Sequence, residues 1–430
     1  MTEKILTARF EKPDSYRLSS YVEDGGYEAL KKALSKTPDE IIDIVKAAGL
    51  RGRGGAGFPA GVKWSFVPKE SEKPKYLCVN GDEGEPGTFK DRYIMELDPH
   101  AIIEGAAIAS YAFGAHVAYI YIRGEFKLPI ERVENALAEA RQAGFLGANI
   151  LDSGYDLDIW VHPGAGAYVC GEETALIESN EGHRGMPRIK PPFPAIVGLF
   201  GGPTVVNNIE TLSYVPHIIN KGPEWFAAMG PEKNGGTKLF GVSGHVKRPG
   251  LYELRMGTPL RKIIYEVCGG MRGDKELKAV IPGGSSTPIL TPGEIDVNMD
   301  YDSLAKIGTM FGSGAIIVIE EGTCIPRLAA RLAKFYAHES CGQCTPCREG
   351  VPWIAKILDR VENGMGLPGD LDQVLKICDN IQGKTICPLG DACAMPIRAM
   401  IVKFRAEFER HVEEGGCPFG PTPTPWDSES

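Results

Sequence analysis

The sequence has no long apolar run and no excess of positive charge. Its 430 residues carry 47 Lys and Arg against 56 Asp and Glu, which gives a net charge of -9 at pH 7. An acidic surface repels phosphates, so nucleic acid is excluded as the main partner. The longest weakly polar stretch, Gly105 to Ile122, contains His116 and is divided by Gly114. We interpret it as a buried helix followed by a buried strand, and expect no direct membrane insertion.

The sequence also lacks the features of a secreted protein. The N-terminus, MTEKILTARFEKPD, is polar and charged, which predicts no signal peptide. The 11 cysteines are odd in number and three of them lie close together, which does not fit a disulfide framework. We therefore expect a soluble protein in a reducing compartment. A chain of 430 residues is too long for one ordinary core, so two or three domains are predicted.

The first half of the chain alternates strand-like and helix-like segments. The predicted strands are Tyr76–Val79, Val117–Ile122 and Leu157–Val161. The predicted helices are Pro38–Ala48, Arg92–Phe113 and Pro129–Ala143. This order predicts an α/β domain, over residues 1–230, with a parallel sheet and helices on its faces. Ligands of such sheets bind at the carboxyl ends of the strands.

The second half predicts two further units. After the linker-like run Gly230–Gly236, a β-grasp (ubiquitin-like) domain is expected over residues 236–324. Its predicted elements are the hairpin Lys238–Val246 and Gly250–Arg255, the helix Leu260–Cys268, and the strands Leu277–Ile281 and Ala315–Ile319. A four-helix bundle over residues 325–416 follows, with helices predicted at 327–338, 348–363, 371–381 and 391–413. The tail 417–430 is expected to be disordered.

A cysteine motif lies in the predicted bundle. The segment HESCGQCTPCREG holds Cys341, Cys344 and Cys347 at C-x-x-C-x-x-C spacing, and Cys387 precedes Pro388 further on. A [4Fe–4S] cluster needs four thiolates, and a tight loop can supply three of them. The triple falls between the first two predicted helices and Cys387 between the last two, so both loops can meet at one end of the bundle. We predict a [4Fe–4S] cluster that carries single electrons.

Two alternatives stay open on spacing alone. A structural zinc site is disfavoured, because zinc usually takes two C-x-x-C pairs or Cys/His pairs. The fourth ligand could instead be Cys378, Cys393 or Cys324, and Cys393 competes best because it is near Cys387. We interpret Cys78, Cys170 and Cys268 as buried thiols. We assign no role to Cys417.

A glycine-rich loop, LRGRGGAGFPAG, covers Leu50–Gly61. It contains G-x-G-x-x-G, but a dinucleotide fingerprint needs a strand before it and a helix after it. Here the preceding segment is helical and Phe58-Pro59 follows, so that interpretation is rejected. The glycines still expose backbone N–H groups and permit close approach of a ligand. Arg51, Arg53 and Lys63 add positive charge for a phosphate, so a ligand loop is favoured over an ordinary flexible one.

Two polar loops follow predicted strands. NGDEGEPGTFKDR comes after Tyr76–Val79 and places Asn80, Asp82, Glu83 and Glu85 at a strand's carboxyl end, where they can hold a flavin edge or ribose hydroxyls. The alternative is a solvated acidic turn.

GAGAYVCGEETALIES follows the strand Leu157–Val161 and offers the Tyr168 ring for stacking. Gly171 begins an expected helix with Glu172 and Glu173 in its first turn, where acids favour the helix dipole. A carboxylate there would also select NADH over NADPH by repelling the 2′-phosphate. Asn207, Asn208 and Thr211 resemble a helix start, which is a phosphate-binding feature, and Lys190 and Phe193 lie in a proline-rich loop.

These motifs, in this order, resemble the flavoprotein, NADH-oxidising subunit of respiratory complex I (NADH:quinone oxidoreductase). The segments that carry the resemblance are GRGGAGFPAGVKW, NGDEGEPGTFKDR, GAYVCGEETALIES and ESCGQCTPCREG. Diaphorase subunits of NAD-linked hydrogenases and formate dehydrogenases share them. The resemblance implies a flavin-binding α/β domain, a β-grasp domain and a four-helix bundle that holds the cluster.

The resemblance also implies a role for each matching residue. The FMN site would comprise Gly52, Arg53, Gly54, Gly55, Lys63, Asn80, Asp82, Tyr168, Gly171, Asn207, Asn208 and Thr211. NADH would contact Phe58, Phe66, Glu85, Glu172, Glu173, Lys190 and Phe193, of which Glu85 and Phe66 position it. The cluster ligands would be Cys341, Cys344, Cys347 and Cys387. No acid–base residue is expected. Gly84 is a departure from the family, and its freedom puts the rigidity of the acidic turn in doubt.

The implied reaction begins with hydride transfer from NADH to FMN, and single electrons then pass to the cluster and on to quinone. The implied partners are a small [2Fe–2S] thioredoxin-like subunit and a large iron–sulfur subunit, at the cytoplasmic face of the inner membrane, or the matrix face in a mitochondrion. The alternatives are a hydrogenase or formate dehydrogenase diaphorase, and a non-catalytic relay or zinc-stabilised scaffold.

Overall fold

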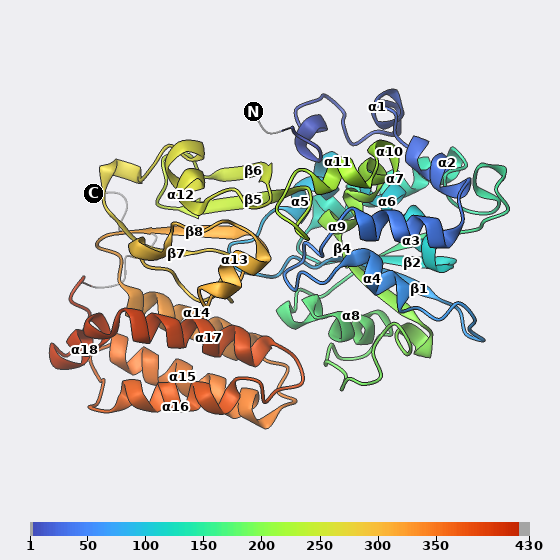
Figure 1. The fold of residues 1–430 in the computed structure, drawn as a ribbon. Helices are drawn as coiled ribbons and strands as arrows, with labels where there is room; N and C mark the ends of the chain where they lie inside the picture. Colours follow the sequence, from blue (N-terminus) through green and yellow to red (C-terminus); the bar gives the residue numbers. More distant parts are fainter. Residues whose placement is uncertain (1–2, 421–430) are drawn as a thin grey trace.

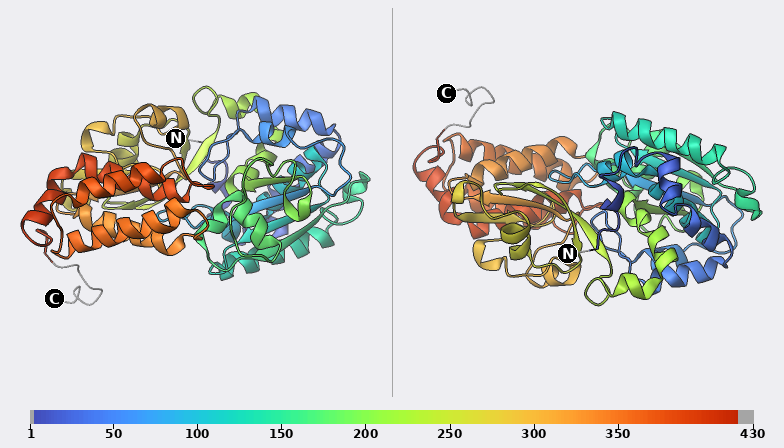
Figure 2. Two further views of the ribbon diagram at one scale, coloured as in Figure 1. Left: turned by 90° about the horizontal axis from the view of Figure 1, so that it is seen from below. Right: turned by 90° about the horizontal axis from the view of Figure 1, so that it is seen from above.

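Two four-stranded sheets and a C-terminal helical bundle make up the part of the chain that the structure, a computed structural model, describes, residues 3–420 (Figure 1). The first sheet and its helices form one end of the molecule. The second sheet packs beside the bundle at the other end, as both views of Figure 2 show. Most of the tail predicted to be disordered lies outside the described residues.

The first sheet is parallel throughout, as the sequence predicts. Its order is β3-β2-β1-β4. The strands are β1 (Tyr76–Gly81), β2 (Val117–Ile122), β3 (Asp158–Pro163) and β4 (Thr204–Asn208). The chain therefore leaves β1 toward β2 on one side, while β4 lies on the other side of β1. Such a change of direction opens a crevice at the carboxyl ends of β1 and β4, which is the usual ligand site of these sheets.

Helices cover both faces of this sheet, and together they form the parallel-sheet unit. They are α1 (Leu18–Glu23), α2 (Glu28–Leu34), α3 (Pro38–Ala47), α4 (Ala60–Ser65), α5 (Asp91–Leu97), α6 (Pro99–Phe113), α7 (Lys127–Gln142), α8 (Glu173–Asn180), α9 (Ile209–Ser213), α10 (Val215–Lys221) and α11 (Pro223–Ala227). Helix α6 is buried on nearly all sides. A Cβ on its Gly105 would lie 2.0 Å from the carbonyl oxygen of Leu212, so glycine is needed where α6 meets α9.

Two local predictions in this unit were wrong in detail, and one strand was not predicted. The single helix expected over Arg92–Phe113 is two, because Asp98 leaves helical geometry (φ -145°, ψ 56°) and Pro99 starts α6. The strand β4 was not predicted, since its apolar run is only two valines long. The helix expected to begin at Gly171 begins at Glu173, after a 3₁₀ turn, η3, over Tyr168–Gly171.

The second sheet is mixed, with the order β6-β5-β8-β7. Its strands are β5 (Thr237–Gly244), β6 (Gly250–Arg255), β7 (Leu277–Ile281) and β8 (Ala315–Glu320), with α12 (Leu260–Lys262), a π turn (Ile263–Val267) and α13 (Tyr301–Lys306) between them. The predicted hairpin is confirmed as the antiparallel pair β5/β6, while β5 and β8 run parallel. We call residues 237–320 the mixed-sheet unit.

The C-terminal bundle contains five helices and not four. They are α14 (Ile325–Glu339), α15 (Thr345–Glu362), α16 (Asp370–Ile381), α17 (Leu389–Lys403) and α18 (Arg405–Glu413). The helix predicted over 391–413 is interrupted at Phe404 (φ -121°, ψ 29°). The break turns Phe408 and His411 inward, and both are fully buried. Among the described residues, no helix has the length and apolar character that a membrane span requires.

A buried ion network joins the two sheets. Glu210 at the start of α9 accepts hydrogen bonds from Lys238 Nζ (2.6 Å) and Leu239 N (2.9 Å) of β5, and lies 3.0 Å from Lys90 Nζ. Burial raises the pKa of the Glu210 carboxyl, but the two lysines outweigh it and hold the pKa below its ordinary value. The network is completely enclosed, since Glu210 and Lys238 are 0% exposed.

We expect Glu210→Ala to destabilise the protein by about 3–5 kcal/mol, because it leaves two buried ammonium groups without their shared partner. Urea unfolding measures the effect. The control Glu414→Ala removes a solvent-exposed ion pair with Arg410 on α18 and should leave the unfolding midpoint unchanged. Equal midpoints for the two variants would contradict this account of the network.

Candidate functional site

The carboxyl ends of β1 and β4 and the glycine-rich loop meet in one place. A Cβ on Gly54 would lie 3.1 Å from the Asn208 Cβ, and Arg53 N donates to Thr211 Oγ1 (2.8 Å). Asn207, at the end of β4, accepts a hydrogen bond from Trp64 Nε1 (2.8 Å). Three segments far apart in the sequence therefore converge at the crevice that the strand order creates.

The glycine loop is fixed in shape by its surroundings. The Arg53 side chain is fully buried, and its Nη2 donates to the carbonyls of Gly235 (2.7 Å) and Thr237 (3.1 Å). Tyr301 of α13 donates to the Gly52 carbonyl (2.6 Å). Gly55 has a φ of +135° and open space where a Cβ would be. The loop thus presents a backbone surface without side chains, and Arg53 serves to hold it in place from behind.

Asp82 is the most unusual polar group at this edge. It is 1% exposed, and neither carboxylate oxygen has a hydrogen-bond partner. Burial raises the pKa of Asp82 to about 7, although Arg123 works in the opposite direction. Its backbone N–H donates to Asn80 Oδ1 (3.0 Å), and Asn80 Nδ2 donates to the Gly171 carbonyl (2.9 Å). The fold therefore holds an acceptor without a donor beside two glycines, Gly84 and Gly171.

The turn after β1 is rigid despite Gly84. Glu83 (φ 38°) caps the start of α5 by accepting hydrogen bonds from the N–H groups of Lys90 (2.7 Å), Asp91 (2.6 Å) and Arg92 (3.0 Å). A Cβ on Gly84 would lie 3.3 Å from the Tyr168 Cα, so the space is already tight. The sequence suggested that Gly84 could make this turn flexible, but the packing around Gly84 holds the turn in one shape.

Glu85 links all three parts of the molecule. Its Oε2 accepts from the Tyr168 hydroxyl (2.7 Å) of η3, and its Oε1 accepts from Ser286 N (2.7 Å) and Ser285 Oγ (3.2 Å) of the mixed-sheet unit. Ser285 Oγ also bonds the Tyr336 hydroxyl (2.7 Å) of α14. Both oxygens of Glu85 are therefore bonded within the protein, which makes it a positioning residue.

Glu172 and Glu173 have different roles at the start of α8. Glu172 is the N-cap and accepts from the N–H groups of Thr174 (2.8 Å) and Ala175 (3.0 Å), as the capping interpretation predicts. Glu173 is held between Lys63 Nζ (2.7 Å) and Lys190 Nζ (3.0 Å). Burial raises the pKa of Glu173, but the two lysines outweigh it and the pKa is lowered. A carboxylate flanked by two cations lies beside the glycine loop.

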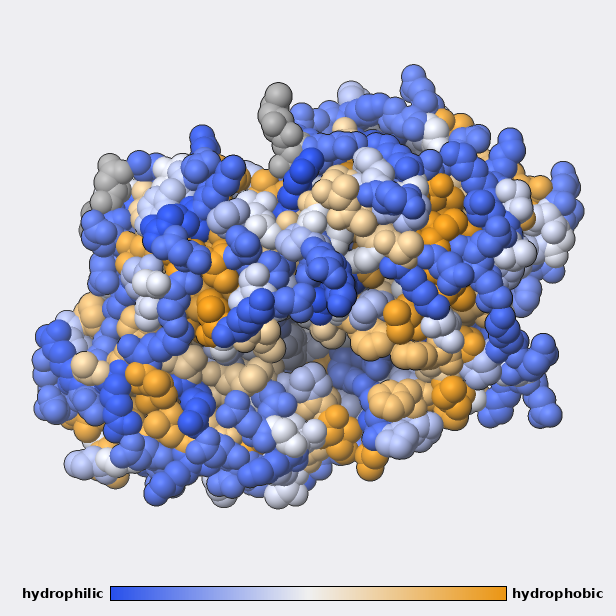
Figure 3. Space-filling view, viewed as in Figure 1, coloured by the Kyte–Doolittle hydropathy of each residue, from blue (hydrophilic) through white to orange (hydrophobic). Residues whose placement is uncertain are grey.

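Three phenylalanines are exposed near these segments. Phe58, Phe66 and Phe193 are 46%, 53% and 58% exposed, which is costly for large apolar rings unless they contact a ligand or partner. The ring centroids of Phe58 and Phe66 lie 6.0 Å apart at an angle of 48°. Phe58 lies in the glycine loop and Phe66 follows α4, so the pair borders the crevice. Figure 3 shows a hollow near the centre of the face that it presents.

The four predicted ligand cysteines line one small pocket at an end of the bundle. Its lining is Ser340, Cys341, Gln343, Cys344, Cys347, Thr385, Cys387 and Leu389. Ile386 N donates to Cys344 Sγ (3.3 Å), and Ser340 Oγ lies 3.2 Å from Cys347 Sγ. The competing cysteines Cys378 and Cys393 are both 0% exposed inside the bundle core. The two predicted loops do meet, and they bring four sulfurs together.

The bundle segments around this pocket pack against segments that border the crevice. Tyr168 N donates to Glu339 Oε2 (3.0 Å) at the end of α14, and Arg184 Nη2 donates to the Cys341 carbonyl (3.2 Å). One continuous apolar cluster contains η3 and α8 residues such as Cys170 and Leu176 together with bundle residues of α14, α15 and α17. The segment that follows β3 therefore packs against both sites.

Several positioning residues were not predicted from sequence. Ser285 and Ser286 hold Glu85, and Tyr301 holds the glycine loop. The only sequence signal for the serines is the Gly283-Gly284 pair shortly after a strand, because such a pair allows a tight turn. Tyr301 gives no local signal, since its partner Gly52 lies far away in the sequence.

Three family descriptions match separate parts of the chain. The Nuo51 FMN-binding domain matches residues 45–217, and the NADH-ubiquinone oxidoreductase-F iron-sulfur binding region matches residues 327–411. The SLBB domain matches residues 239–290.

Curated proteins and a solved structure are similar along almost the whole chain. An NADH-quinone oxidoreductase F subunit of Rhizobium meliloti (strain 1021) is 55% identical over 420 residues, which cover 97% of this chain and 100% of that protein. The NADH-quinone oxidoreductase F subunit of Mycobacterium bovis is 51% identical over 424 residues, which cover 97% and 95%. The crystal structure of an NAD⁺-reducing [NiFe]-hydrogenase in the H₂-reduced state is 34% identical with a TM-score of 0.83, over 97% of this chain and 67% of that chain.

The residues present fit both cofactors that these families bind. Asp82 offers an unused, buried acceptor of the kind that a ribityl hydroxyl of FMN would satisfy. Gly55 leaves room for close approach to the loop backbone. At the bundle, four thiols converge on one pocket, and thiolates are the ligands of [4Fe–4S] clusters.

The raised pKa of Asp82 predicts a pH dependence for the flavin-free protein. The folded pKa of about 7 lies above the unfolded value of about 3.9, so the folded state binds the proton more tightly. The resulting stability is present below about pH 4 and is lost as the pH rises through 7, by about 4 kcal/mol in total. Asp82→Asn should remove this contribution and make the loss of stability between pH 5 and pH 8 smaller than in the wild type, where burial also raises the pKa of Glu83 and of Asp98 to about 7; urea unfolding at the two pH values measures the difference.

The control Asp39→Asn removes a carboxylate from an exposed ion pair with Lys69. It should show the same loss of stability between pH 5 and pH 8 as the wild type. With FMN bound, Asp82→Asn removes an ionised acceptor and should weaken binding about 10- to 100-fold. A wild-type protein whose stability is the same at pH 5 and pH 8 would rule out this account of Asp82.

Proposed function

The chain belongs to the family of NADH-quinone oxidoreductase F subunits, and we propose on that basis that it oxidises NADH for a respiratory complex I, with FMN and a [4Fe–4S] cluster as its cofactors. The observation that carries the proposal is the direct packing of the cysteine pocket against the segment that borders the crevice. Electron transfer falls steeply with distance, so one chain that holds both sites side by side can pass electrons between them.

We propose that FMN lies over the glycine loop at the ends of β1 and β4. The residues that would hold it are Gly52, Arg53, Gly54, Gly55, Lys63, Asn80, Asp82, Tyr168, Gly171, Asn207, Asn208 and Thr211. Arg53, Asn207 and Thr211 would act mainly by fixing the loop and the strand end, since their side chains bond to protein groups. Asp82 would accept a hydrogen bond from the cofactor.

We propose that NADH enters between the exposed rings of Phe58, Phe66 and Phe193. Stacking on these rings would align the nicotinamide with the flavin, which is the main catalytic requirement of hydride transfer. When bound, FMN supplies a centre that accepts a hydride and gives up single electrons. The protein needs no acid or base for this step, because the hydride carries both electrons and its own proton.

The polar contacts of NADH would come from Glu85, Glu172, Glu173 and Lys190. Glu85 acts by positioning, because its oxygens are bonded to Tyr168, Ser285 and Ser286. Glu172 supports the start of α8, and Glu173 presents the carboxylate that disfavours a 2′-phosphate. We assign Cys341, Cys344, Cys347 and Cys387 as the cluster ligands.

We also propose three domains within the chain. They are an FMN- and NADH-binding α/β domain (1–230), a β-grasp domain (236–324) and a cluster-binding helical domain (325–416). The β-grasp assignment is supported by the strand order β6-β5-β8-β7 with a parallel central pair, which is the arrangement expected when a hairpin is followed by a crossover.

We infer that the partners are a small [2Fe–2S] thioredoxin-like subunit and a large iron–sulfur subunit, which would carry electrons from the cluster toward quinone. We place the protein at the cytoplasmic face of the inner membrane, attached through the complex. A second candidate is the diaphorase role in a hydrogenase, which the likeness to the NAD⁺-reducing [NiFe]-hydrogenase supports. Identifying the chains that co-purify with this one separates the two.

Glu173→Ala should relax the preference for NADH. Lys63 would lose its carboxylate partner and Lys190 would keep only Glu172 (2.9 Å), so both lysines could better attract the 2′-phosphate of NADPH. We expect kcat/KM for NADPH relative to NADH to rise about tenfold or more, which corresponds to about 1.4 kcal/mol. The control Glu178→Gln, on the same helix but paired with Arg188, should leave the ratio unchanged. An unaltered ratio in Glu173→Ala removes this residue from the ribose site.

Cys387→Ser should abolish electron transfer beyond the flavin. It removes one of four cluster ligands, so iron content should fall well below about four per chain while flavin is retained. NADH should still bleach the flavin absorption. The matched control is Cys393→Ala, which removes a nearby thiol buried in the bundle core and should keep the iron. If Cys393→Ala lost iron and Cys387→Ser kept it, the fourth cluster ligand would be Cys393 and not Cys387.

A further inference from the structure

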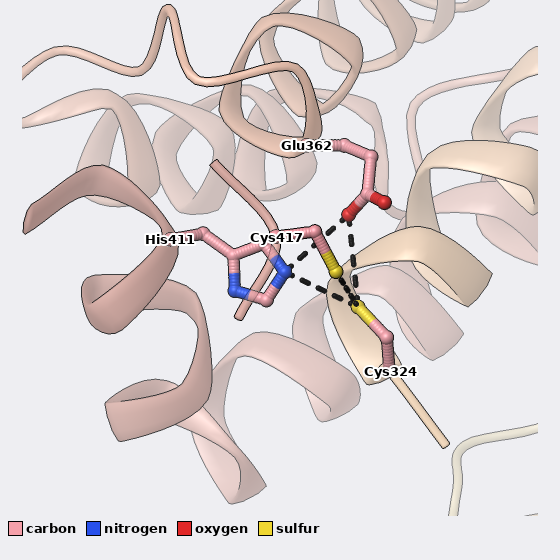
Figure 4. A group of neighbouring side chains, drawn as sticks. All are labelled: Cys324, Glu362, His411 and Cys417. Carbon is pink, nitrogen blue, oxygen red and sulfur yellow. Dashed lines mark hydrogen bonds and ion pairs between the residues drawn. The ribbon is translucent and has the colours of Figure 1, made fainter. Parts of the chain in front are cut away.

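A second group of metal-ligating side chains lies at the opposite end of the bundle. Cys324 directly precedes α14, Glu362 is the last residue of α15, His411 lies on α18, and Cys417 follows α18 (Figure 4). The cluster cysteines instead lie at the other end, where three of them follow α14 and Cys387 precedes α17. Helix α14 has 15 residues, so the two sites are separated by about 22 Å along it.

The four potential ligand atoms are spaced as around one tetrahedral ion. His411 Nε2 lies 3.2 Å from Cys324 Sγ and 3.4 Å from Glu362 Oε2. Cys324 Sγ lies 3.6 Å from both Cys417 Sγ and Glu362 Oε2. Zinc bonds of about 2.3 Å to sulfur and about 2.0–2.1 Å to nitrogen or oxygen place tetrahedral ligand atoms about 3.3–3.8 Å apart. The observed separations are close to these values without any rearrangement.

The surrounding groups orient each ligand as in a built metal site. His411 Nδ1 lies 2.7 Å from the Glu407 carbonyl, so its proton is on Nδ1 and Nε2 is available for a metal. Arg327 Nε donates to the outer oxygen of Glu362 (2.6 Å). Arg327 N also donates to Cys324 Sγ (3.3 Å), a bond that stabilises a thiolate. Each of these three ligands is thus held in place by a second contact.

Charge and burial also favour a cation here. His411 is 0% exposed and Cys324 is 5% exposed, so neither group is solvated. Two thiolates and a carboxylate carry three negative charges. A divalent cation together with Arg327 balances them, and binding releases the two thiol protons. A disulfide is the other use of two adjacent thiols, but it needs about 2.05 Å between the sulfurs and Sγ–Sγ is 3.6 Å.

We propose that Cys324, Glu362, His411 and Cys417 bind a structural Zn²⁺. Two sulfurs, an imidazole and a carboxylate suit zinc better than the hard cations Mg²⁺ and Ca²⁺, and all four positions are filled by protein, as in structural sites. Cys324 lies at the exit from β8, and Cys417 lies beyond the last helix. The ion would therefore fasten the C-terminal segment to the junction between the mixed-sheet unit and the bundle.

The test is zinc analysis of the purified protein with its flavin and cluster in place. We expect about one zinc per chain in addition to the cluster iron, and zinc-edge X-ray absorption should report two sulfur and two nitrogen or oxygen neighbours. Cys417→Ser should lower zinc content at least tenfold without loss of iron or flavin, since Cys417 is only partly buried and lies outside the bundle core. Cys417→His should retain zinc, because imidazole replaces the thiolate as a ligand.

The matched control is Cys268→Ser, which changes a thiol of the mixed-sheet unit and should keep the full zinc content. Three results would each overturn the proposal: wild-type protein that holds less than about a tenth of a zinc after incubation with Zn²⁺ and desalting; zinc content that Cys417→Ser does not alter; or an all-sulfur zinc environment, which places the metal at the other cysteines. A disulfide between Cys324 and Cys417, detected by intact mass, would also overturn it.

Discussion

The arrangement of the two redox sites depends on the hydrogen bonds of the Glu85 carboxylate. This carboxylate is partly buried, and burial raises its pKa, yet it accepts hydrogen bonds from Tyr168, Ser285 and Ser286. Through Ser285 the network reaches Tyr336 of the bundle. The turn after β1, the 3₁₀ turn η3, the mixed-sheet unit and α14 are thereby fixed to one another. The position of the cysteine pocket relative to the crevice follows from this network and from the apolar cluster beside it.

That constraint explains how a two-electron donor can serve a one-electron carrier. In the proposed function, the crevice residues would hold a flavin and align a nicotinamide, while the bundle loops would hold the cluster at the far side of η3. Tyr168 takes part on both sides, since its hydroxyl bonds Glu85 and its backbone N–H bonds Glu339 at the end of α14. The protein contributes position and electrostatics, and it leaves the redox chemistry to the cofactors.

The sequence was sufficient for the elements and motifs that have local signals. The parallel sheet, the hairpin and the meeting of the two cysteine loops all followed from periodicity and spacing. The break at Phe404 and the strand β4 did not, because neither differs from its flanks in composition over a long enough window. The partners of Glu85 and Arg53 could not be predicted either, since they lie about 80 to 200 residues away and depend on tertiary packing. The group around His411 was missed for the same reason, as Cys324 and Cys417 are 93 residues apart.

The account predicts that this single chain couples the oxidation of NADH to the one-electron reduction of the cluster. An anaerobic titration of the purified protein with NADH, followed by absorption and by electron paramagnetic resonance, tests this most directly. Each NADH should deliver two electrons, bleach the flavin bands and produce the signal of a reduced [4Fe–4S] cluster at up to about one spin per chain. Flavin that bleaches fully in excess NADH without any cluster signal, or a protein that contains no flavin, would contradict it.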